Sequence, residues 1–174
     1  MKIYIAGPDI FRPDVLDWAE SVRLTCAGFG HEALIPFDLN VTTPEAIFQA
    51  NMLLLQSAEI VIANLNPFRG AEPDSGTCVE VGYALAIGKK AIGYIQSPTT
   101  MIERVAALQG TPLTLDHDNY RDQDGLSIEN FGLPLNLMLS VPVKMVIGGL
   151  VDCLTELNRI LIETNHTSTD PQHE

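Results

Sequence analysis

The chain has 174 residues and carries 10 Lys and Arg against 22 Asp and Glu, which gives a formal net charge of −12. A chain of this length is typical of one domain with a single hydrophobic core. The acidic balance argues against a nucleic-acid binder and against docking on anionic membranes, because both need a surface rich in Lys and Arg.

Short apolar runs alternate with helical patterns along most of the chain. Runs rich in β-branched residues, such as Ile60–Leu65, predict strands that are buried on both faces. Amphipathic spacing predicts helices, such as Asp14–Ala27, and Gly28 and Gly30 favour the end of that helix. The expected elements in chain order are strand Ile3–Ala6, helix Asp14–Ala27, strand Ala33–Phe37, helix Pro44–Gln56, strand Ile60–Leu65, helix Ser75–Ile87, strand Ala91–Ile95, helix Thr99–Leu108 and helix Val146–Ile162.

Two segments near the C-terminus lack a clear periodicity. The segment Thr111–Asn130 is polar and rich in Asp, and we interpret it as a solvated loop. The apolar run Leu135–Ser140 is ambiguous between a strand and a helical turn. We expect a single domain over residues 1–163, followed by a disordered tail over residues 164–174, because the tail is polar and contains Asp, Pro and His.

The alternation of strands and helices predicts an α/β fold, in which helices cover both faces of a parallel sheet. In open sheets of this kind, ligands bind outside the carboxyl ends of the strands. The segments that follow those ends are therefore the places to look for a site. These segments are Gly7–Arg12, Asp38–Thr43, Asn64–Glu80 and Gln96–Thr100.

The sequence favours a cytoplasmic protein without a metal or a cofactor. The N-terminal residues enter the first expected strand directly and show no signal peptide, and no apolar stretch reaches the roughly 20 residues that span a bilayer. Cys26, Cys78 and Cys153 are isolated and odd in number, which is typical of reduced thiols. The spacing of Cys and His does not match a zinc site.

The segment Asn66–Glu80 contains a pair of carboxylates, Asp74 and Glu80, that points to specific chemistry. Cleavage of a glycosidic bond needs two carboxyl groups of different character: one is ionised to attack or stabilise C1, and the other holds a proton for the leaving group. Glu80 lies within about two turns of the expected helix start, where the helix dipole favours the ionised, nucleophilic form. Asp74 lies just ahead of this helix, in a loop where it could meet a leaving base.

An ordinary structural role for the same residues stays open at this point. The stretch from Thr77 to Glu80 fits the capping-box pattern, in which Glu80 reaches back to the backbone N–H of Thr77. Asp74 or Ser75 fits the N-cap position equally well. Arg69, in the same segment, either pairs with a nearby acid or contacts a ligand.

Several segments of the chain resemble the nucleoside 2-deoxyribosyltransferase family, in the family's order and spacing. The most specific of them is the pattern Asp-x-Gly-Thr-x-x-Glu-x-Gly-x-Ala that begins at Asp74. The resemblance implies a flavodoxin-like (Rossmann-like) parallel five-stranded sheet and a ping-pong exchange of 2-deoxyribose between nucleobases. The matching segments are Ile3–Pro8, Glu59–Leu65, Asp74–Ala84 and Phe131–Met138.

Matched residue by residue, the resemblance also implies roles for single side chains. Glu80 falls on the catalytic nucleophile, Asp74 on the carboxylate that handles the base and its proton, and Tyr4 on the tyrosine that orients the nucleophile. Asn136 and Met138 fall on residues that a neighbouring subunit contributes to the sugar site. The resemblance therefore implies a homo-oligomer with a shared active site, whose partners are small-molecule nucleosides and nucleobases.

Two features depart from the family pattern. Asn51 stands where some members have a second base-contacting Asp, so the proton chemistry at the base rests more heavily on Asp74. The insertion Pro67–Pro73 is longer than in the compact members and leaves the base selectivity open. The residues expected to contact substrate are Gly7, Asp9, Phe11, Asn51, Gly76, Asn136 and Met138, and the ring of Phe11 is suited to stacking on a base.

Two other functions remain alternatives. The first is an N-glycoside hydrolase that acts on deoxynucleosides or on their 5′-monophosphates. Recognition of a 5′-phosphate needs a cradle of Ser, Gly and basic groups after the first strand. The chain offers Asp9 there instead, which favours a neutral nucleoside. The second alternative is a non-catalytic nucleotide-binding module on the same fold.

Overall fold

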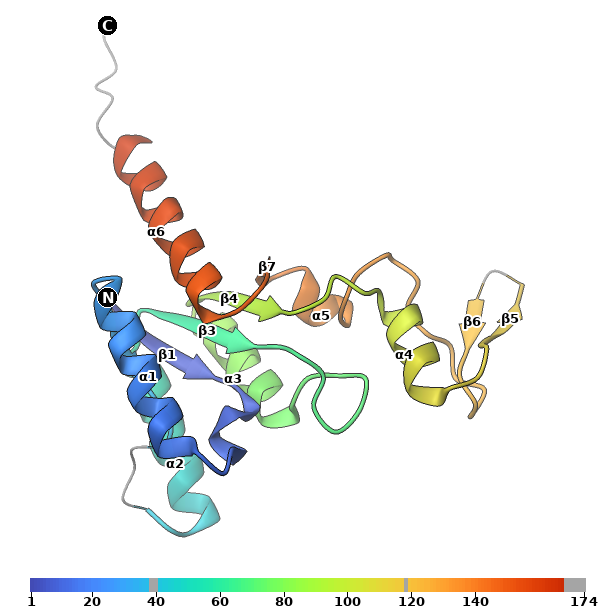
Figure 1. Cartoon of the computed structure of the whole chain (residues 1–174), viewed down its shortest axis with the longest axis horizontal. Coiled ribbons are helices and arrows are strands. Elements are labelled where there is room, and N and C mark those ends of the chain that lie inside the picture. Colours follow the sequence, from blue (N-terminus) through green and yellow to red (C-terminus); the bar gives the residue numbers. More distant parts are fainter. Residues whose placement is uncertain (38–40, 118, 168–174) are drawn as a thin grey trace, which may run out of the picture.

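A computed structural model describes residues 1–37, 41–117 and 119–167 of the chain. Its centre is a parallel sheet with the strand order β2 (Glu32–Leu34), β1 (Lys2–Ala6), β3 (Ile60–Asn64), β4 (Lys90–Ile95) and β7 (Lys144–Ile147). Helices α1 (Val15–Gly28) and α6 (Leu150–Thr167) cover one face, and α2 (Pro44–Ser57) and α3 (Ser75–Ala86) cover the other (Figure 1). The predicted α/β sheet with helices on both faces is confirmed.

The sheet divides the core into two apolar layers, because successive side chains of a strand point to opposite faces. Ile3 and Ile5 of β1 pack on the side of α1 and α6. Tyr4 lies between them in the sequence and points to the opposite side, where it joins the layer that contains Val81 and Ala84 of α3. The strand period thus places a buried tyrosine under the helix that carries Glu80.

The fifth strand lies where the sequence predicted the beginning of a helix. Lys144–Ile147 pairs in parallel with β4, and the last helix begins only at Leu150. The chain separates the two elements at Gly148, whose φ of 139° is open mainly to glycine. The expectation of a helix from Val146 was therefore wrong at its N-terminal end, since the apolar residues there pair in the sheet.

Other boundaries differ only slightly from the expected ones, with two exceptions. The strand expected over Ala33–Phe37 ends at Leu34, and the candidate site segment after it includes residues 38–40, which lie outside the described residues. Helix α6 continues to Thr167, past the expected domain end at residue 163. The rest of the expected tail, residues 168–174, also lies outside the described part of the chain.

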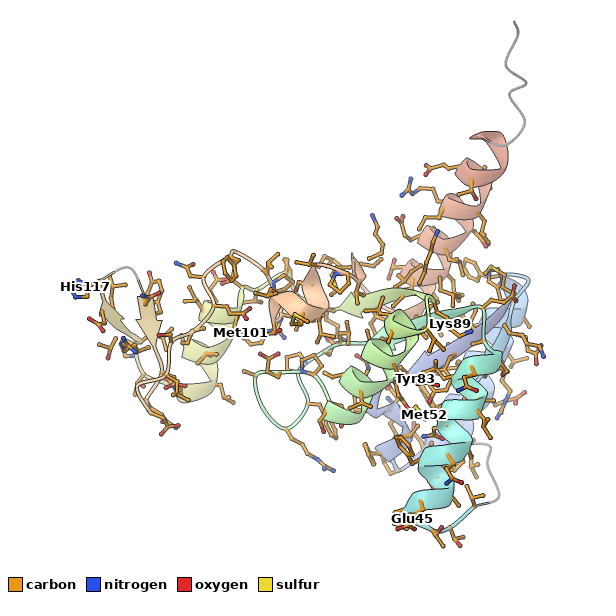
Figure 2. All side chains as sticks on the ribbon, turned by 180° about the vertical axis from the view of Figure 1, so that it is seen from behind. Glu45, Met52, Tyr83, Lys89, Met101 and His117 are labelled. Carbon is orange, nitrogen blue, oxygen red and sulfur yellow. The ribbon has the colours of Figure 1, made fainter. Side chains whose placement is uncertain are left out.

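Residues 97–136 form an extension that leaves the edge of the sheet (Figure 1). It contains α4 (Met101–Gln109) and an antiparallel hairpin of β5 (Thr114–Asp116) and β6 (Asn119–Arg121). Figure 2 shows Met101 at the start of α4 and His117 at the far end of the extension, well away from Tyr83 and Lys89. The interpretation of Thr111–Asn130 as a loop was therefore incomplete. The two strands of the hairpin are short and largely polar, so the sequence shows no clear alternation of apolar and polar residues there.

A helical turn, α5 (Leu137–Ser140), returns the chain from the extension to β7. This resolves the ambiguity of the run Leu135–Ser140 in favour of helix. Asn136 is the N-cap of this turn, because its Oδ1 accepts a hydrogen bond from the backbone N–H of Met138 at 3.0 Å. No helix in the described ranges is both long enough and apolar enough to cross a membrane.

Candidate active site

A cavity of about 390 Å³ opens at the carboxyl edge of the sheet. Its walls come from the segments after β1, β2 and β3, together with one residue of α2 and the first turns of α3. The following residues expected at the site line this cavity: Gly7, Phe11, Asn51, Asp74, Gly76 and Glu80. The sheet topology thus brings side chains together that are far apart in the sequence, at the edge where ligands are expected.

Glu80 is held inside this cavity by Tyr4. The hydroxyl of Tyr4 donates a hydrogen bond to Oε1 of Glu80 at 2.6 Å, and the Tyr4 side chain is completely buried. Burial raises the pKa of Tyr4 well above its usual value, and the charge of Glu80 adds to this effect. Tyr4 therefore stays protonated and serves only as a donor to Glu80.

Burial dominates the electrostatics of Glu80. It raises the pKa of Glu80 to about 7, against the hydrogen bond from Tyr4, which lowers it; the nearby negative charge of Asp74 raises it further. The sequence argument expected the helix dipole to favour the ionised form. The structure corrects this expectation: near neutral pH the protonated and ionised forms of Glu80 coexist, because desolvation outweighs the favourable contacts.

Asp74, rather than Glu80, caps helix α3. Its Oδ2 accepts hydrogen bonds from the backbone N–H of Thr77 at 2.9 Å and from the Thr77 hydroxyl at 3.1 Å. The helix begins at Ser75, so the capping-box interpretation of Thr77 to Glu80 is wrong and the N-cap alternative for Asp74 is confirmed. Among the described residues, Oδ1 of Asp74 accepts no hydrogen bond, and this oxygen is left for a ligand.

Two glycines keep the cavity open next to the carboxylates. A side chain at Gly76 would place its Cβ only 3.0 Å from Oδ2 of Asp74. A side chain at Gly7 would place its Cβ 2.9 Å from Cβ of Asn64, where the ends of β1 and β3 approach each other. Both positions therefore act through the space they leave rather than through a functional group.

Asn51 faces the same cavity from α2. Its amide oxygen is buried and accepts no hydrogen bond from the described part of the chain. An unpaired buried oxygen is unusual in a folded protein and points to a missing partner. Asn51 is therefore suited to accept a hydrogen bond from a bound base, as the sequence comparison led us to expect of this position.

Asp9 follows β1 as expected, but it is not among the residues that line the cavity. Its Oδ2 accepts a hydrogen bond from the side chain of Asn64 at 2.7 Å, and Oδ1 lies 4.0 Å from Arg12. The carboxylate of Asp9 thus links the loop after β1 to the end of β3. Through these contacts Asp9 supports the cavity wall.

Asn136 and Met138 lie apart from the Glu80 cavity of their own chain. They line a separate groove of about 540 Å³ between α3 and α5, which also includes Cys78 and Gly82. The amide of Asn136 donates a hydrogen bond to Oε1 of Glu129 at 2.7 Å, and Met138 is 72% exposed. A single chain therefore does not bring these two residues to the nucleophile.

The sequence analysis did not predict the cluster that Phe11, Phe68 and Arg69 form at the cavity. The two phenylalanine rings stack with centroids 5.6 Å apart, and the guanidinium carbon of Arg69 lies 4.6 Å from the centre of Phe68. No ion pair of Arg69 occurs within the described ranges, so the suggested pairing with an acid is not observed there. The adjacent Phe and Arg in the insertion were a signal, but their contact with Phe11 depends on the fold.

The described residues contain no group of three or more His, Cys, Asp and Glu side chains that could hold a metal ion. Cys26 and Cys153 are buried and Cys78 is half-buried, and all of them are free thiols. The chemistry available in the cavity is therefore that of two carboxylates, a buried tyrosine hydroxyl, an unpaired amide and one guanidinium group.

Comparisons with known proteins bear on the family and the fold of the chain. A family model for nucleoside 2-deoxyribosyltransferase matches residues 3–138. Among solved structures, the chain is similar to a 2-deoxyribosyltransferase from Leishmania mexicana, with a TM-score of 0.74 and 33% sequence identity over 91% of this chain and 97% of that chain. An uncharacterised protein from Schizosaccharomyces pombe is 28% identical over 168 residues, which cover 86% of this chain and 79% of that protein.

Proposed function

The chain belongs to the nucleoside 2-deoxyribosyltransferase family, and on this premise we propose that it transfers 2-deoxyribose between nucleobases through a covalent intermediate on Glu80. The flavodoxin-like fold that the resemblance implied is confirmed. The observation that carries the proposal is the hydrogen bond that Tyr4 donates to Glu80, in a cavity that Asp74 also lines. The proposed substrates of the enzyme are small-molecule nucleosides and nucleobases.

In the first half of the reaction, ionised Glu80 attacks C1′ of a 2′-deoxynucleoside through an oxocarbenium-like transition state. A bond forms between a carboxylate oxygen and C1′ while the bond from C1′ to the base nitrogen breaks. The electron pair of the broken bond stays on the base, and Asp74 supplies a proton to it. The products are the free base, ionised Asp74 and a deoxyribosyl ester of Glu80.

In the second half, Asp74 takes a proton from an incoming base, and the nitrogen of that base attacks C1′. The ester bond breaks and its electron pair returns to Glu80, which restores the carboxylate. Two inversions at C1′ give net retention. Tyr4 supports both halves of the reaction. Its hydrogen bond to Oε1 of Glu80 fixes the carboxylate and leaves the other carboxylate oxygen free to attack C1′.

We also propose that the active site is shared between copies of the chain in a homo-oligomer. Asn136 and Met138 lie away from their own Glu80 cavity, and Met138 is largely exposed. This placement suits residues that complete the sugar site of a neighbouring subunit. The separation of the two groups within one chain supports the proposal, since a single copy leaves its own cavity without them.

A turnover assay with two parallel reactions tests the proposed activity. The protein is incubated with deoxyinosine and free adenine, and separately with deoxyinosine in buffer alone. Formation of deoxyadenosine is the expected result and demonstrates transfer. Release of hypoxanthine without exchange would instead indicate a hydrolase, and the absence of turnover would indicate a binding module.

Mass spectrometry of the intact protein then tests the covalent step. Brief incubation with deoxyinosine should add the mass of one deoxyribosyl group to the chain, and peptide mapping should locate it on Glu80. The Glu80→Ala variant is the matched control and should acquire no such mass. Transfer activity without any adduct on Glu80 would contradict the proposed intermediate.

A further inference from the structure

Arg69 occupies an unusual position at the edge of the Glu80 cavity. It lies between β3 and α3, in the insertion whose consequence for base selectivity the sequence left open. Its φ of 56° falls in the left-handed region, which is uncommon for a residue other than glycine. Its side chain lines the cavity together with Asp74 and Glu80. The backbone at Arg69 is thus held in a conformation that needs support from its surroundings.

Two aromatic rings lie against the side chain of Arg69. Phe11 belongs to the short 3-10 helix η1 (Pro8–Phe11) after β1, and Phe68 precedes Arg69 in the chain. The rings are nearly parallel, with an angle of 11° between their planes. The guanidinium carbon of Arg69 lies 4.6 Å from the centre of the Phe68 ring and 5.4 Å from that of Phe11. A cation held over ring faces keeps its N–H donors available for other partners.

The charges around the cavity give this guanidinium a role. Among the described residues that line the cavity, Arg69 is the one with a basic side chain, and Asp74 and Glu80 are the ones with acidic side chains. The neighbouring Arg12 is engaged elsewhere, since it binds Asp14 at 2.9 Å. Arg69 forms no ion pair with any residue in the described ranges. Arg69 is exposed, and an acceptor on a bound ligand would replace solvent at its N–H groups.

The bound base is the ligand component that needs a positive group at this place. When the bond to C1′ breaks, the base receives an electron pair, and negative charge develops on the base until the proton from Asp74 neutralises it. A guanidinium group stabilises it most strongly when its fork meets two adjacent acceptors. Hypoxanthine and guanine present such a pair at O6 and N7, whereas adenine presents a donor at N6 beside N7.

We propose, on the basis of the proposed function, that Arg69 determines specificity by binding O6 and N7 of a 6-oxopurine base in the cavity. The stack of Phe11 and Phe68 holds the guanidinium group for this contact. The enzyme therefore prefers deoxyinosine and deoxyguanosine over deoxyadenosine as deoxyribose donors. Arg69 contacts the base itself and thereby adds a positive group to the two carboxylates that carry the chemistry.

The test compares the release of free base from two donors, each with the same acceptor base in excess, by the wild type and by variants at Arg69. Arg69→Met removes the charge and the donors, and Arg69→Lys keeps the charge but removes the fork. Arg69→Met should lower kcat/KM about ten- to a hundredfold for deoxyinosine and less than about threefold for deoxyadenosine. Arg69→Lys should lose most of the same preference, because an ammonium group does not span O6 and N7.

The controls separate this contact from other roles. Arg23→Met, on α1, removes an arginine that does not line the cavity and should leave both donors unchanged. Deoxyinosine 5′-monophosphate serves as a further donor, and a loss confined to this compound would mean that Arg69 binds phosphate, which overturns the proposal. Urea unfolding of each variant confirms that the comparison is made between folded proteins.

The results distinguish the two levels of the argument. In one case the wild type is active and its preference for deoxyinosine survives in Arg69→Met; in another the wild type is active and kcat/KM falls equally for both donors in this variant. Either result overturns the assignment of Arg69 and leaves the proposed transfer intact. Wild type that releases no base from any donor overturns the proposed function, and the assignment of Arg69 with it. Selective loss with deoxyinosine in both Arg69 variants supports the assignment.

Discussion

The sheet region and the extension of residues 97–136 are held together in different ways. Around the sheet, two apolar layers fix α1, α2, α3 and α6, and the Glu80 cavity is built directly on this core. Polar contacts are prominent in the extension, such as the bond from Arg121 to Asp116 in its hairpin at 2.8 Å. The chemistry thus lies on the part of the molecule that is built on the apolar core, and the extension projects away from the sheet (Figure 1).

This difference indicates what each region contributes. A nucleophile must be placed accurately, and packing in a close-packed core provides that accuracy. Asn136 lies at the junction of the two regions and is held by Glu129 from the extension at 2.7 Å. Changes in the sheet region should therefore affect turnover, and changes in the extension should affect sharing of the site or local stability.

Removal of the nucleophile should have the largest effect. Glu80→Ala is expected to lower the transfer rate by at least about a thousandfold, because the covalent route is lost. The urea midpoint should not fall as it would for a lost helix cap, since Asp74 and not Glu80 caps α3. Transfer at the wild-type rate in a folded Glu80→Ala protein would refute the assignment of the nucleophile.

Mixing two inactive variants should restore activity if the site is shared. Glu80→Ala lacks the nucleophile, and Asn136→Ala lacks the residue proposed to serve the neighbouring subunit. Co-refolded mixtures should contain sites that join an intact Glu80 to an intact Asn136, and should transfer well above either variant alone. Light scattering of the mixture reports the oligomer. Failure to recover activity in a mixed oligomer would contradict the shared site.

The pH dependence should reflect the buried Glu80. Because its pKa is raised to about 7, protonation of Glu80 should lower kcat/KM on the acid side of the profile, and the profile should be bell-shaped because the reaction also needs a proton from Asp74. Tyr4→Phe removes the bond that lowers this pKa, so the rise should move to higher pH and the rate at pH 7 should fall about ten- to a hundredfold. A profile that does not move in Tyr4→Phe would contradict the role of the tyrosine.

The same group should also make stability depend on pH. Its folded-state pKa is raised from 4.5 to about 7, so the folded state binds more protons than the unfolded state between these values. The stabilisation from neutral Glu80 is complete at low pH and is lost as the pH rises through about 7. The side chain in Glu80→Gln stays neutral at both pH values. The free energy of unfolding of this variant, relative to that of the wild type, should therefore be about 1–3 kcal/mol higher at pH 8 than at pH 4. Urea titrations at both pH values measure this difference.

A smaller effect is expected at Glu129, which holds Asn136 from the extension. Its carboxylate accepts hydrogen bonds from the Asn136 amide at 2.7 Å and from the backbone N–H of Leu137 at 2.9 Å. Glu129→Gln keeps the size but offers one acceptor, and should raise KM about fivefold with little change in kcat. Steady-state kinetics with deoxyinosine tests this. A change of about fivefold in kcat with no change in KM would argue against a positioning role.

The smallest effect is expected at the cap of α4, far from the cavity. Thr100 and Glu103 form a reciprocal capping box at its N-terminus. Thr100→Ala should lower the local unfolding free energy of α4 by about 0.5–2 kcal/mol, seen as faster hydrogen exchange over residues 101–109, and should leave transfer unchanged. A large loss of transfer would show that the extension is coupled to the chemistry more tightly than its contacts suggest.

Local patterns in the sequence were sufficient for most of the fold. Buried parallel strands appear as continuous apolar runs and surface helices as amphipathic repeats, so both are visible within a short window of residues. The pattern fails for β7, where the apolar residues before Gly148 suit a helix or a strand equally well. It also fails for the hairpin of the extension, whose short polar strands have no buried face to mark them.

The sequence by itself determined four of the five strands of the sheet and the helices between them, the acidic pair of Asp74 and Glu80, and the family to which the chain belongs. The tertiary structure decided how these groups behave. Burial sets the pKa of Glu80 against the expectation from the helix dipole, and the approach of η1 to the insertion stacks Arg69 on Phe11 and Phe68. Periodicity and motifs are local properties of a chain, whereas desolvation and contact between distant segments exist only once the chain has folded.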